Sequence, residues 1–173
     1  MKNKALIVVD MQNDFISGVL GSPGARAIVS RVAEAIKGFD GEIYATMDTH
    51  TEEYPQTAEG RRIPAHCVKD TEGWKLPEEI AEVLAARGAF IVEKGTFGSL
   101  ELADRLKEHP DGFKGIALCG LCTDICVVGN ALVLRAAFPK AEIAVLADCC
   151  AGTTEGMHEA ALDVMRSCCI SVK

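Results

Sequence analysis

Residues 115–137, GIALCGLCTDICVVGNALVLRAA, contain the pattern that decides the fold. The first five residues, GIALC, are apolar on both faces, which suits a strand inside a parallel sheet. After Gly120 the pattern becomes helical and continues over residues 124–137. The segment therefore predicts a buried strand that leads into a helix, which is the repeating unit of α/β proteins.

Five further apolar runs and four further helical patterns repeat this unit along the chain. Pro77 followed by Glu78 and Glu79 is typical of a helix start, because proline suits the first turn and carboxylates favour its positive dipole end. The alternation predicts a three-layer α/β/α sandwich with right-handed crossovers around a six-stranded, mostly parallel sheet. The expected strands are residues 5–9, 42–47, 89–92, 115–119, 143–147 and 169–172, and the expected helices are residues 24–38, 77–87, 99–109, 124–137 and 155–167.

Length and composition indicate an ordinary globular protein. The 173 residues are enough to bury one core, so we expect a single domain over residues 1–173. A net charge of -7 without clusters of Lys and Arg argues against a nucleic-acid partner, and no apolar run is long enough to span a membrane. The start, MKNKALIVVD, superficially resembles a signal peptide, but its apolar run of five residues stops at Asp10. We therefore expect a cytoplasmic protein.

The chain has eight cysteines, and we expect them to be reduced thiols. A domain of this length does not need disulfides to fold, and the sequence shows no export signal. Adjacent cysteines have a geometry that opposes a mutual disulfide. We expect the adjacent cysteines to be small buried residues near strand ends: Cys149, Cys150, Cys168 and Cys169.

Ionisable side chains follow the expected strands, at the edge of the sheet where α/β proteins bind their ligands. Asp10 follows the first strand, Lys94 follows the third, and CGLCTDIC, residues 119–126, continues from the fourth. An irregular stretch, residues 49–75, follows the second strand, and loops of this length usually have a function. The other ionisable residues at these strand ends are Asp48, His50, Glu93 and Asp148.

The segment CGLCTDIC allows three interpretations: a metal cage, a redox pair of Cys119 with Cys122, or one nucleophile, Cys126. Thr123 or Asp124 can cap the helix that follows, which places Cys126 in its first turn, where unpaired N–H groups and the helix dipole stabilise a thiolate. We favour the nucleophile, with Cys119 in the core. A thiol nucleophile needs a base, and Asp10 is the candidate, with Lys94 as a neighbouring cation.

A second group of residues has the composition of a metal site. Asp48 and His50 are two residues apart at a strand end, so both side chains leave on the same side. Glu59 and His66 follow in the long loop, whereas Cys67 should point the other way. Two imidazoles and two carboxylates suit zinc, or manganese or iron.

These segments resemble a known family. DMQNDF (residues 10–15), KGTFGS (94–99) and GLCTDICV (120–127) are similar to the three signature segments of the isochorismatase-like cysteine hydrolases. The string from DTH to PAHC, residues 48–67, resembles the metal site of the nicotinamidases within that family. The resemblance covers essentially the whole chain, including DCCAGTTEGMHEAAL near its end.

The resemblance implies an isochorismatase-like hydrolase fold with a triad of Asp10, Lys94 and Cys126. It also implies a cis peptide bond between Leu121 and Cys122, which would turn the N–H groups of Cys122 and Cys126 toward one oxyanion. Asp10 would take the thiol proton, Cys126 would attack a carboxamide carbon, and the resulting thioester would be hydrolysed after ammonia has left.

The implied reaction converts nicotinamide to nicotinic acid in pyridine-nucleotide biosynthesis. A metal ion on Asp48, His50, Glu59 and His66, most simply zinc, would bind the pyridine nitrogen. Phe15 matches a position of the family that packs against the ring of the substrate, and we expect Phe97 to line the same pocket. The chain departs from the nicotinamidases at Ile63, where they usually have an aromatic residue, so the resemblance specifies the substrate less firmly than the reaction.

Two alternatives stay open. The first is a hydrolase of another small amide or of isochorismate, although the metal residues argue against the latter. The second is a thiol redox-sensing module without turnover. The resemblance further implies a homo-oligomer, and we assign no role to His109 or His158, which fall on expected helices away from the strand ends.

Overall fold

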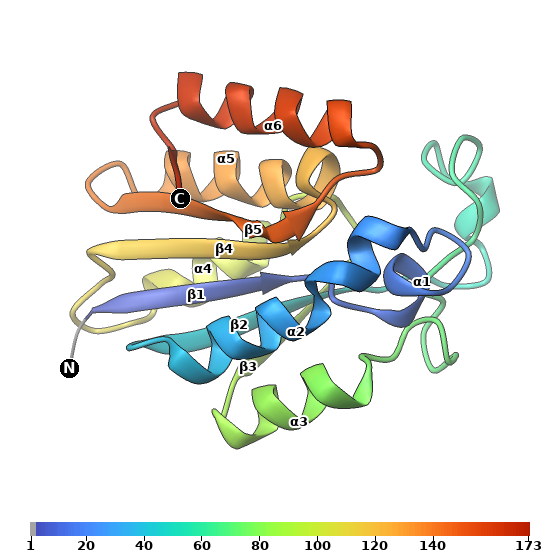
Figure 1. The fold of residues 1–173 in the computed structure, drawn as a ribbon, viewed down its shortest axis with the longest axis horizontal. Helices are drawn as coiled ribbons and strands as arrows, with labels where there is room; N and C mark the ends of the chain where they lie inside the picture. Colours follow the sequence, from blue (N-terminus) through green and yellow to red (C-terminus); the bar gives the residue numbers. More distant parts are fainter. Residues whose placement is uncertain (1–2) are drawn as a thin grey trace.

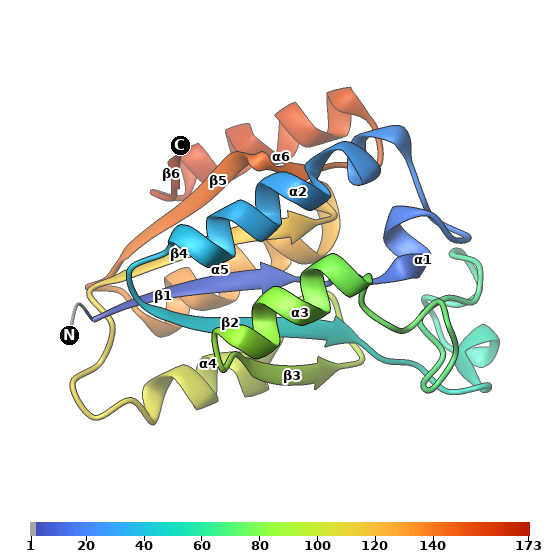
Figure 2. The same cartoon turned by 60° about the horizontal axis from the view of Figure 1, so that its bottom comes forward.

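Six strands form one sheet in the computed structural model, which describes residues 3–173. The strand order is β3-β2-β1-β4-β5-β6, and every neighbouring pair is parallel. The predicted six-stranded sheet is therefore confirmed (Figures 1 and 2). The strands are β1 (Lys4–Val9), β2 (Glu42–Asp48), β3 (Phe90–Lys94), β4 (Gly115–Leu121), β5 (Glu142–Ala151) and β6 (Ser171–Val172).

Helices cover both faces of the sheet, which gives the three predicted layers (Figures 1 and 2). One face carries α2 (Pro23–Gly38) and α3 (Glu78–Ala86), and the other carries α4 (Leu100–Lys107), α5 (Val128–Ala137) and α6 (Glu155–Ser167). Three short elements lie near the carboxyl ends of the strands. They are α1 (Asn13–Ile16), the 3-10 turn η1 (Tyr54–Gln56) and the π-helical turn η2 (Thr123–Val127).

The centre of the core is β1, which has a strand on each side and helices above and below. Residues 5–9, ALIVV, are all 0% exposed, as a strand that is apolar on both faces requires. Ile7 pairs with Tyr44 of β2 and with Leu118 of β4. The first buried run of the chain thus fixes the register of the sheet on both sides.

The order of the strands reverses between β1 and β4. The chain leaves β1 toward the face covered by α2 and leaves β4 toward the face covered by α5, so a crevice opens between the two strand ends. Gly120 allows the close approach here: it has φ +113, and a Cβ on it would collide with the backbone of Val9. The residues after β1 and β4 therefore meet in the crevice.

Two local expectations are wrong. The side chains of Thr123 and Asp124 do not cap the helix after β4, which instead begins with the π turn η2. Cys168 and Cys169 are exposed, because they lie in the turn that ends α6, and the last strand begins only at Ser171.

Within residues 3–173, none of the helices combines the length and the hydrophobicity that a membrane crossing needs.

Candidate active site

The carboxyl ends of β1, β3 and β4 bring together a carboxylate, an amine and a thiol. Asp10 directly follows β1, Lys94 is the last residue of β3, and Cys126 lies in η2, only 3% exposed. Lys94 Nζ lies 2.7 Å from Asp10 Oδ2 and 3.6 Å from Cys126 Sγ. Thr46 donates a hydrogen bond of 2.6 Å to Asp10 Oδ1. All three predicted residues thus meet within contact distance.

Burial governs the protonation of these groups. It raises the pKa of Asp10, although the charge of Lys94 opposes the rise. Burial and then the charge of Asp10 raise the pKa of Cys126 well above its usual value. Burial would lower the pKa of Lys94, but the charges of Asp10, Cys126 and Asp48 outweigh it and raise that pKa. Both shifts favour a neutral thiol beside a charged amine, in contrast to the thiolate expected from the helix end alone.

The four predicted metal ligands also converge. One donor atom from each of Asp48, His50, Glu59 and His66 lies within 4.8 Å of the other three. Asp48 Oδ2 is 3.0 Å from His50 Nε2 and 3.2 Å from His66 Nε2, and Glu59 Oε1 is 3.9 Å from His50 Nε2. Burial disfavours the charge of Asp48, but hydrogen bonds to the two imidazoles and the charge of Lys94 hold its pKa below the ordinary value.

The hydrogen-bonding roles at His66 indicate that a cation fits this group. His66 Nδ1 lies 2.8 Å from the carbonyl oxygen of Pro64, which can only accept, so Nδ1 carries the hydrogen. In a neutral ring Nε2 then presents a lone pair to Asp48 Oδ2, which also presents only lone pairs. A cation between these atoms removes the conflict, and the Pro64 contact is the outer-shell partner that metal-binding histidines usually have.

Residues 12–14 bond backbone atoms of the long loop and of Asp48 just before it, a role that the sequence did not reveal. The buried Gln12 accepts from Asp48 N (2.7 Å) and donates to the carbonyls of Asp48 and Trp74 (2.8 Å each). Asn13 donates to the Glu72 carbonyl, and Asp14 accepts from Cys67 N at 2.8 Å. Their position inside DMQNDF was the only available signal.

A cavity of about 370 Å³ joins the thiol to three of the four candidate metal ligands. Phe15 and Phe97 both line it, as expected, and Phe15 lies edge-on to His66 with ring centroids 5.3 Å apart. Ile63 also lines the cavity, whereas Trp74 does not and instead donates to Thr49. The remaining lining residues are Leu20, Gly21, Ser22, Asp48, Glu59, Arg62, Pro64, His66, Cys122, Ile125, Cys126, Gly152 and Thr153.

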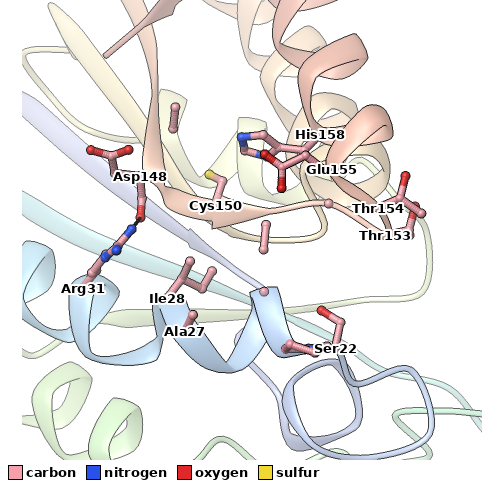
Figure 3. A pocket seen from close by; sticks show the side chains of 15 residues that line it. Ser22, Ala27, Ile28, Arg31, Asp148, Cys150, Thr153, Thr154, Glu155 and His158 are labelled. Atoms are coloured by element: carbon pink, nitrogen blue, oxygen red, sulfur yellow. Dashed lines mark hydrogen bonds between the residues drawn. The ribbon is translucent and has the colours of Figure 1, made fainter.

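Two strand-end residues take no part in this cavity. Glu93 is exposed and pairs with Lys69 at 2.6 Å. Asp148 lies within β5, which continues to Ala151, and it lines a second cavity of about 450 Å³ between α2, β5 and α6 (Figure 3). Of the eight cysteines, all free thiols, Cys119 is buried in the core and Cys122 lines the first cavity.

The two histidines without an assigned role differ in position. His109 lies 3.1 Å from Glu42, at the start of β2 and therefore far from the site. His158 lines the second cavity, and its Nδ1 is 2.8 Å from the Thr123 hydroxyl in η2. The expectation that His158 lies away from the strand ends is wrong, because α6 begins at that edge of the sheet.

The peptide bond between Leu121 and Cys122 is cis, as the resemblance implied.

Comparison with known proteins identifies the family. The model of the isochorismatase domain matches residues 4–172. The chain belongs to the isochorismatase family. It is 32% identical over 143 residues to the isochorismatase family protein PncA of Bacillus subtilis, covering 75% of this chain and 76% of that protein. The resemblance seen in the motifs is thus confirmed, and the chain is a hydrolase of this family.

Two further relatives match over nearly their whole length. The nicotinamidase/pyrazinamidase of Mycobacterium tuberculosis is 29% identical over 194 residues, which covers 98% of this chain and 97% of that protein. The crystal structure of the pyrazinamidase of Pyrococcus horikoshii in complex with zinc superposes with a TM-score of 0.82 at 32% identity, over 99% of this chain and 98% of that one.

Proposed function

We propose that this protein is a cysteine amidohydrolase that converts nicotinamide to nicotinic acid and ammonia. The observation that carries the proposal is the position of Lys94. Its amine contacts Asp10 at 2.7 Å and Cys126 at 3.6 Å, and it also lies 3.4 Å from Asp48 of the metal set. One buried cation thus joins an acid–thiol pair to a candidate metal site across a single cavity.

In the first half of the reaction, Asp10 accepts the Cys126 proton and Sγ attacks the carboxamide carbon. Burial makes Asp10 a stronger base than an exposed carboxylate, because its pKa is raised. The N–H groups of Cys122 and Cys126 hold the oxyanion that forms. Asp10 then passes its proton to the amide nitrogen, the C–N bond breaks, and ammonia leaves behind a thioester on Cys126.

In the second half, a water molecule attacks the thioester carbon while Asp10 takes one of its protons. The C–S bond breaks, the carboxylic acid is released, and Asp10 returns the proton to Cys126. Lys94 keeps its charge throughout, because the neighbouring carboxylates raise its pKa. It stabilises the sulfur whenever the sulfur is negative.

Asp48, His50, Glu59 and His66 would hold the metal ion, and zinc suits their mixed imidazole and carboxylate ligands. When bound, the ion would supply a Lewis acid for the ring nitrogen of a heteroaromatic amide. The zinc complex of the Pyrococcus horikoshii pyrazinamidase supports this choice, with manganese or iron as alternatives. Phe15 and Phe97 would pack against the ring of the substrate.

Ile63 favours a second candidate substrate class within the same chemistry. It lines the cavity with an aliphatic side chain where the nicotinamidases usually have an aromatic one, so ring stacking at this position does not select nicotinamide over other small amides, pyrazinamide among them. Isochorismate hydrolysis would use no ring nitrogen and would leave the four metal ligands without a purpose. The single domain, the cytoplasmic location, the role in pyridine-nucleotide biosynthesis and the homo-oligomer stay predictions.

A panel of small carboxamides tests the proposal. The purified protein is incubated with nicotinamide, pyrazinamide, benzamide and isochorismate, with and without chelator, and ammonia or product is measured. We expect ammonia from the two heteroaromatic amides, loss of activity with chelator, and no turnover by Cys126→Ala. Normal rates in that variant would refute the nucleophile. Turnover of isochorismate alone, or reversible disulfides without any turnover, would favour the two alternatives instead.

A further inference from the structure

The turn that carries Cys126 is held from outside by α6. The hydroxyl of Thr123, which is fully buried, lies 2.8 Å from His158 Nδ1. The carboxylate of Asp124 accepts from the N–H and the hydroxyl of Thr153, at 2.8 Å and 2.6 Å. Thr123 and Asp124, which were expected to cap the helix after β4, therefore bond residues at the start of α6 instead.

The start of α6 fits closely against this turn. A Cβ on Gly152 would come within 2.9 Å of the His158 backbone and side chain, so a larger residue at position 152 would push α6 away. Gly152 and Thr153 line the first cavity as well as the second, whereas His158 lines only the second (Figure 3). His158 thus contacts the turn from outside the first cavity.

The position of the turn matters because it holds both Sγ and the two N–H groups assigned to the oxyanion. Thr123 follows Cys122 directly and precedes Cys126 by three residues, so a shift of Thr123 moves all of these groups. A displacement of a reacting group by about 1 Å can cost about 100-fold in rate. Side chains from other elements hold the turn at several atoms, and the hydroxyl of Thr123 is the one that His158 holds.

We propose that His158 is a positioning residue for the reaction, acting through Thr123 on the turn that carries Cys126. The proposal rests on the proposed amidase function, since it assigns the turn a role in catalysis. His158 is not among the residues that line the first cavity, and it has no direct role in the chemistry. Its contribution is the Nδ1 hydrogen bond, which fixes where the turn sits.

Substitutions that separate the two ring nitrogens test this assignment. Asparagine places a polar atom where the imidazole has Nδ1, whereas glutamine reaches to the position of Nε2. We expect His158→Ala and His158→Gln to lower kcat by about 10- to 100-fold with KM within about twofold. His158→Asn should recover most of kcat. Thr123→Val should reproduce the loss, Thr123→Ser should not, and the His158→Ala, Thr123→Val double variant should lose no more than either single one.

Hydrogen exchange provides a readout that does not depend on the substrate. The backbone amides of residues 119–130, followed by mass spectrometry, should lose protection in His158→Ala and keep it in His158→Asn. Unchanged protection and unchanged kcat in all three His158 variants would overturn the proposal. So would losses that follow the melting temperature and are equal for Asn, Gln and Ala. If the wild type hydrolyses no carboxamide, the amidase function fails, and exchange still decides whether His158 positions the turn.

Discussion

The two ends of the cavity are built in different ways. At the thiol end, Asp10 and Lys94 sit at strand ends and Cys126 in the turn after a strand, and all three are almost fully buried. At the metal end, Asp48 and His50 come from the end of β2, but Glu59 and His66 come from the long loop after it. The sheet therefore positions the bond-breaking groups directly, whereas part of the metal site depends on how a loop folds.

The two ends are nevertheless coupled. Lys94 contacts Asp10 and Asp48 at the same time, and Gln12, two residues after Asp10, bonds the backbone of Asp48 on both its N–H and its carbonyl. A change at one end can reach the other through either contact. Substitutions at the thiol end, at the metal end and at Lys94 test whether a change at one end alters the chemistry of the other.

The largest effect is expected for Lys94→Met. Without the ammonium, only the hydrogen bond from Thr46 opposes the effect of burial on Asp10, so the pKa of this carboxyl rises further and it becomes less able to accept the proton of Cys126. We expect kcat/KM to fall by about 100- to 10,000-fold in ammonia release. The free energy of unfolding, measured by denaturant titration, should fall by about 3–5 kcal/mol, because buried carboxylates lose their counter-ion.

Lys69→Met is the matched control for this substitution. Lys69 pairs with Glu93 at 2.6 Å, but both side chains are about half exposed, at 51% and 43%. Such a pair contributes at most about 1 kcal/mol, and it lies outside the cavity. If both lysine variants lost activity equally, the link through Lys94 would have no special role.

The acid limb of the pH–rate profile is the second prediction. Asp10 is active when ionised, and burial raises its pKa, so kcat/KM should be lost as pH falls through a value above the ordinary Asp pKa of about 3.9. Below that point the rate should fall by about tenfold per pH unit. Since Lys94 lowers the pKa of Asp10, the residual activity of Lys94→Met should show its limb at higher pH. A limb at or below the ordinary value, or one that Lys94→Met leaves in place, would contradict Asp10 as the base.

Glu59→Gln tests the metal end alone. The amide keeps the shape of the side chain but removes a charge from the ligand set, so metal affinity should fall by about 10- to 100-fold in a chelator competition assay. Activity should return at excess metal, and iodoacetamide should alkylate Cys126 at the wild-type rate. Glu52→Gln, an exposed change in the same loop, is the control. Slower alkylation in Glu59→Gln would show that the two ends are not separable.

The same contrast explains how much could be predicted from the sequence. A strand that is buried on both faces can lie only inside the sheet, so the run ALIVV predicts that Asp10, which follows it, lies at the edge of the sheet. The same argument predicted the positions of Lys94 and Cys126. Crossover rules then bring these strand ends to one edge. Asp48 and His50 could be predicted to lie together because they are two residues apart at the end of a strand.

The features that were missed depend on contacts between distant segments. Gln12 gives no sign in its own sequence that it will bond Asp48, and Thr123 looks like a helix cap until α6 offers it His158. Cys169 was expected to begin the last strand and Cys168 to pack beside it, but both lie in an exposed turn after α6, and the strand begins only at Ser171. Local pattern predicts elements well and says little about which side chain an element will bond.

The smallest predicted effect concerns the substrate and is tested at Ile63. This residue lines the cavity on the loop side, where an aromatic ring could stack on a heteroaromatic substrate. Such a contact contributes about 0.5–1.5 kcal/mol, so Ile63→Trp should lower KM for nicotinamide by about 2- to 10-fold and leave kcat within about twofold. Val164→Trp, on the exposed face of α6, adds the same ring where no substrate binds and should change neither constant. A fall in kcat with unchanged KM in Ile63→Trp would mean that this loop wall acts on the thiol end, because a wall that only binds the ring changes affinity alone.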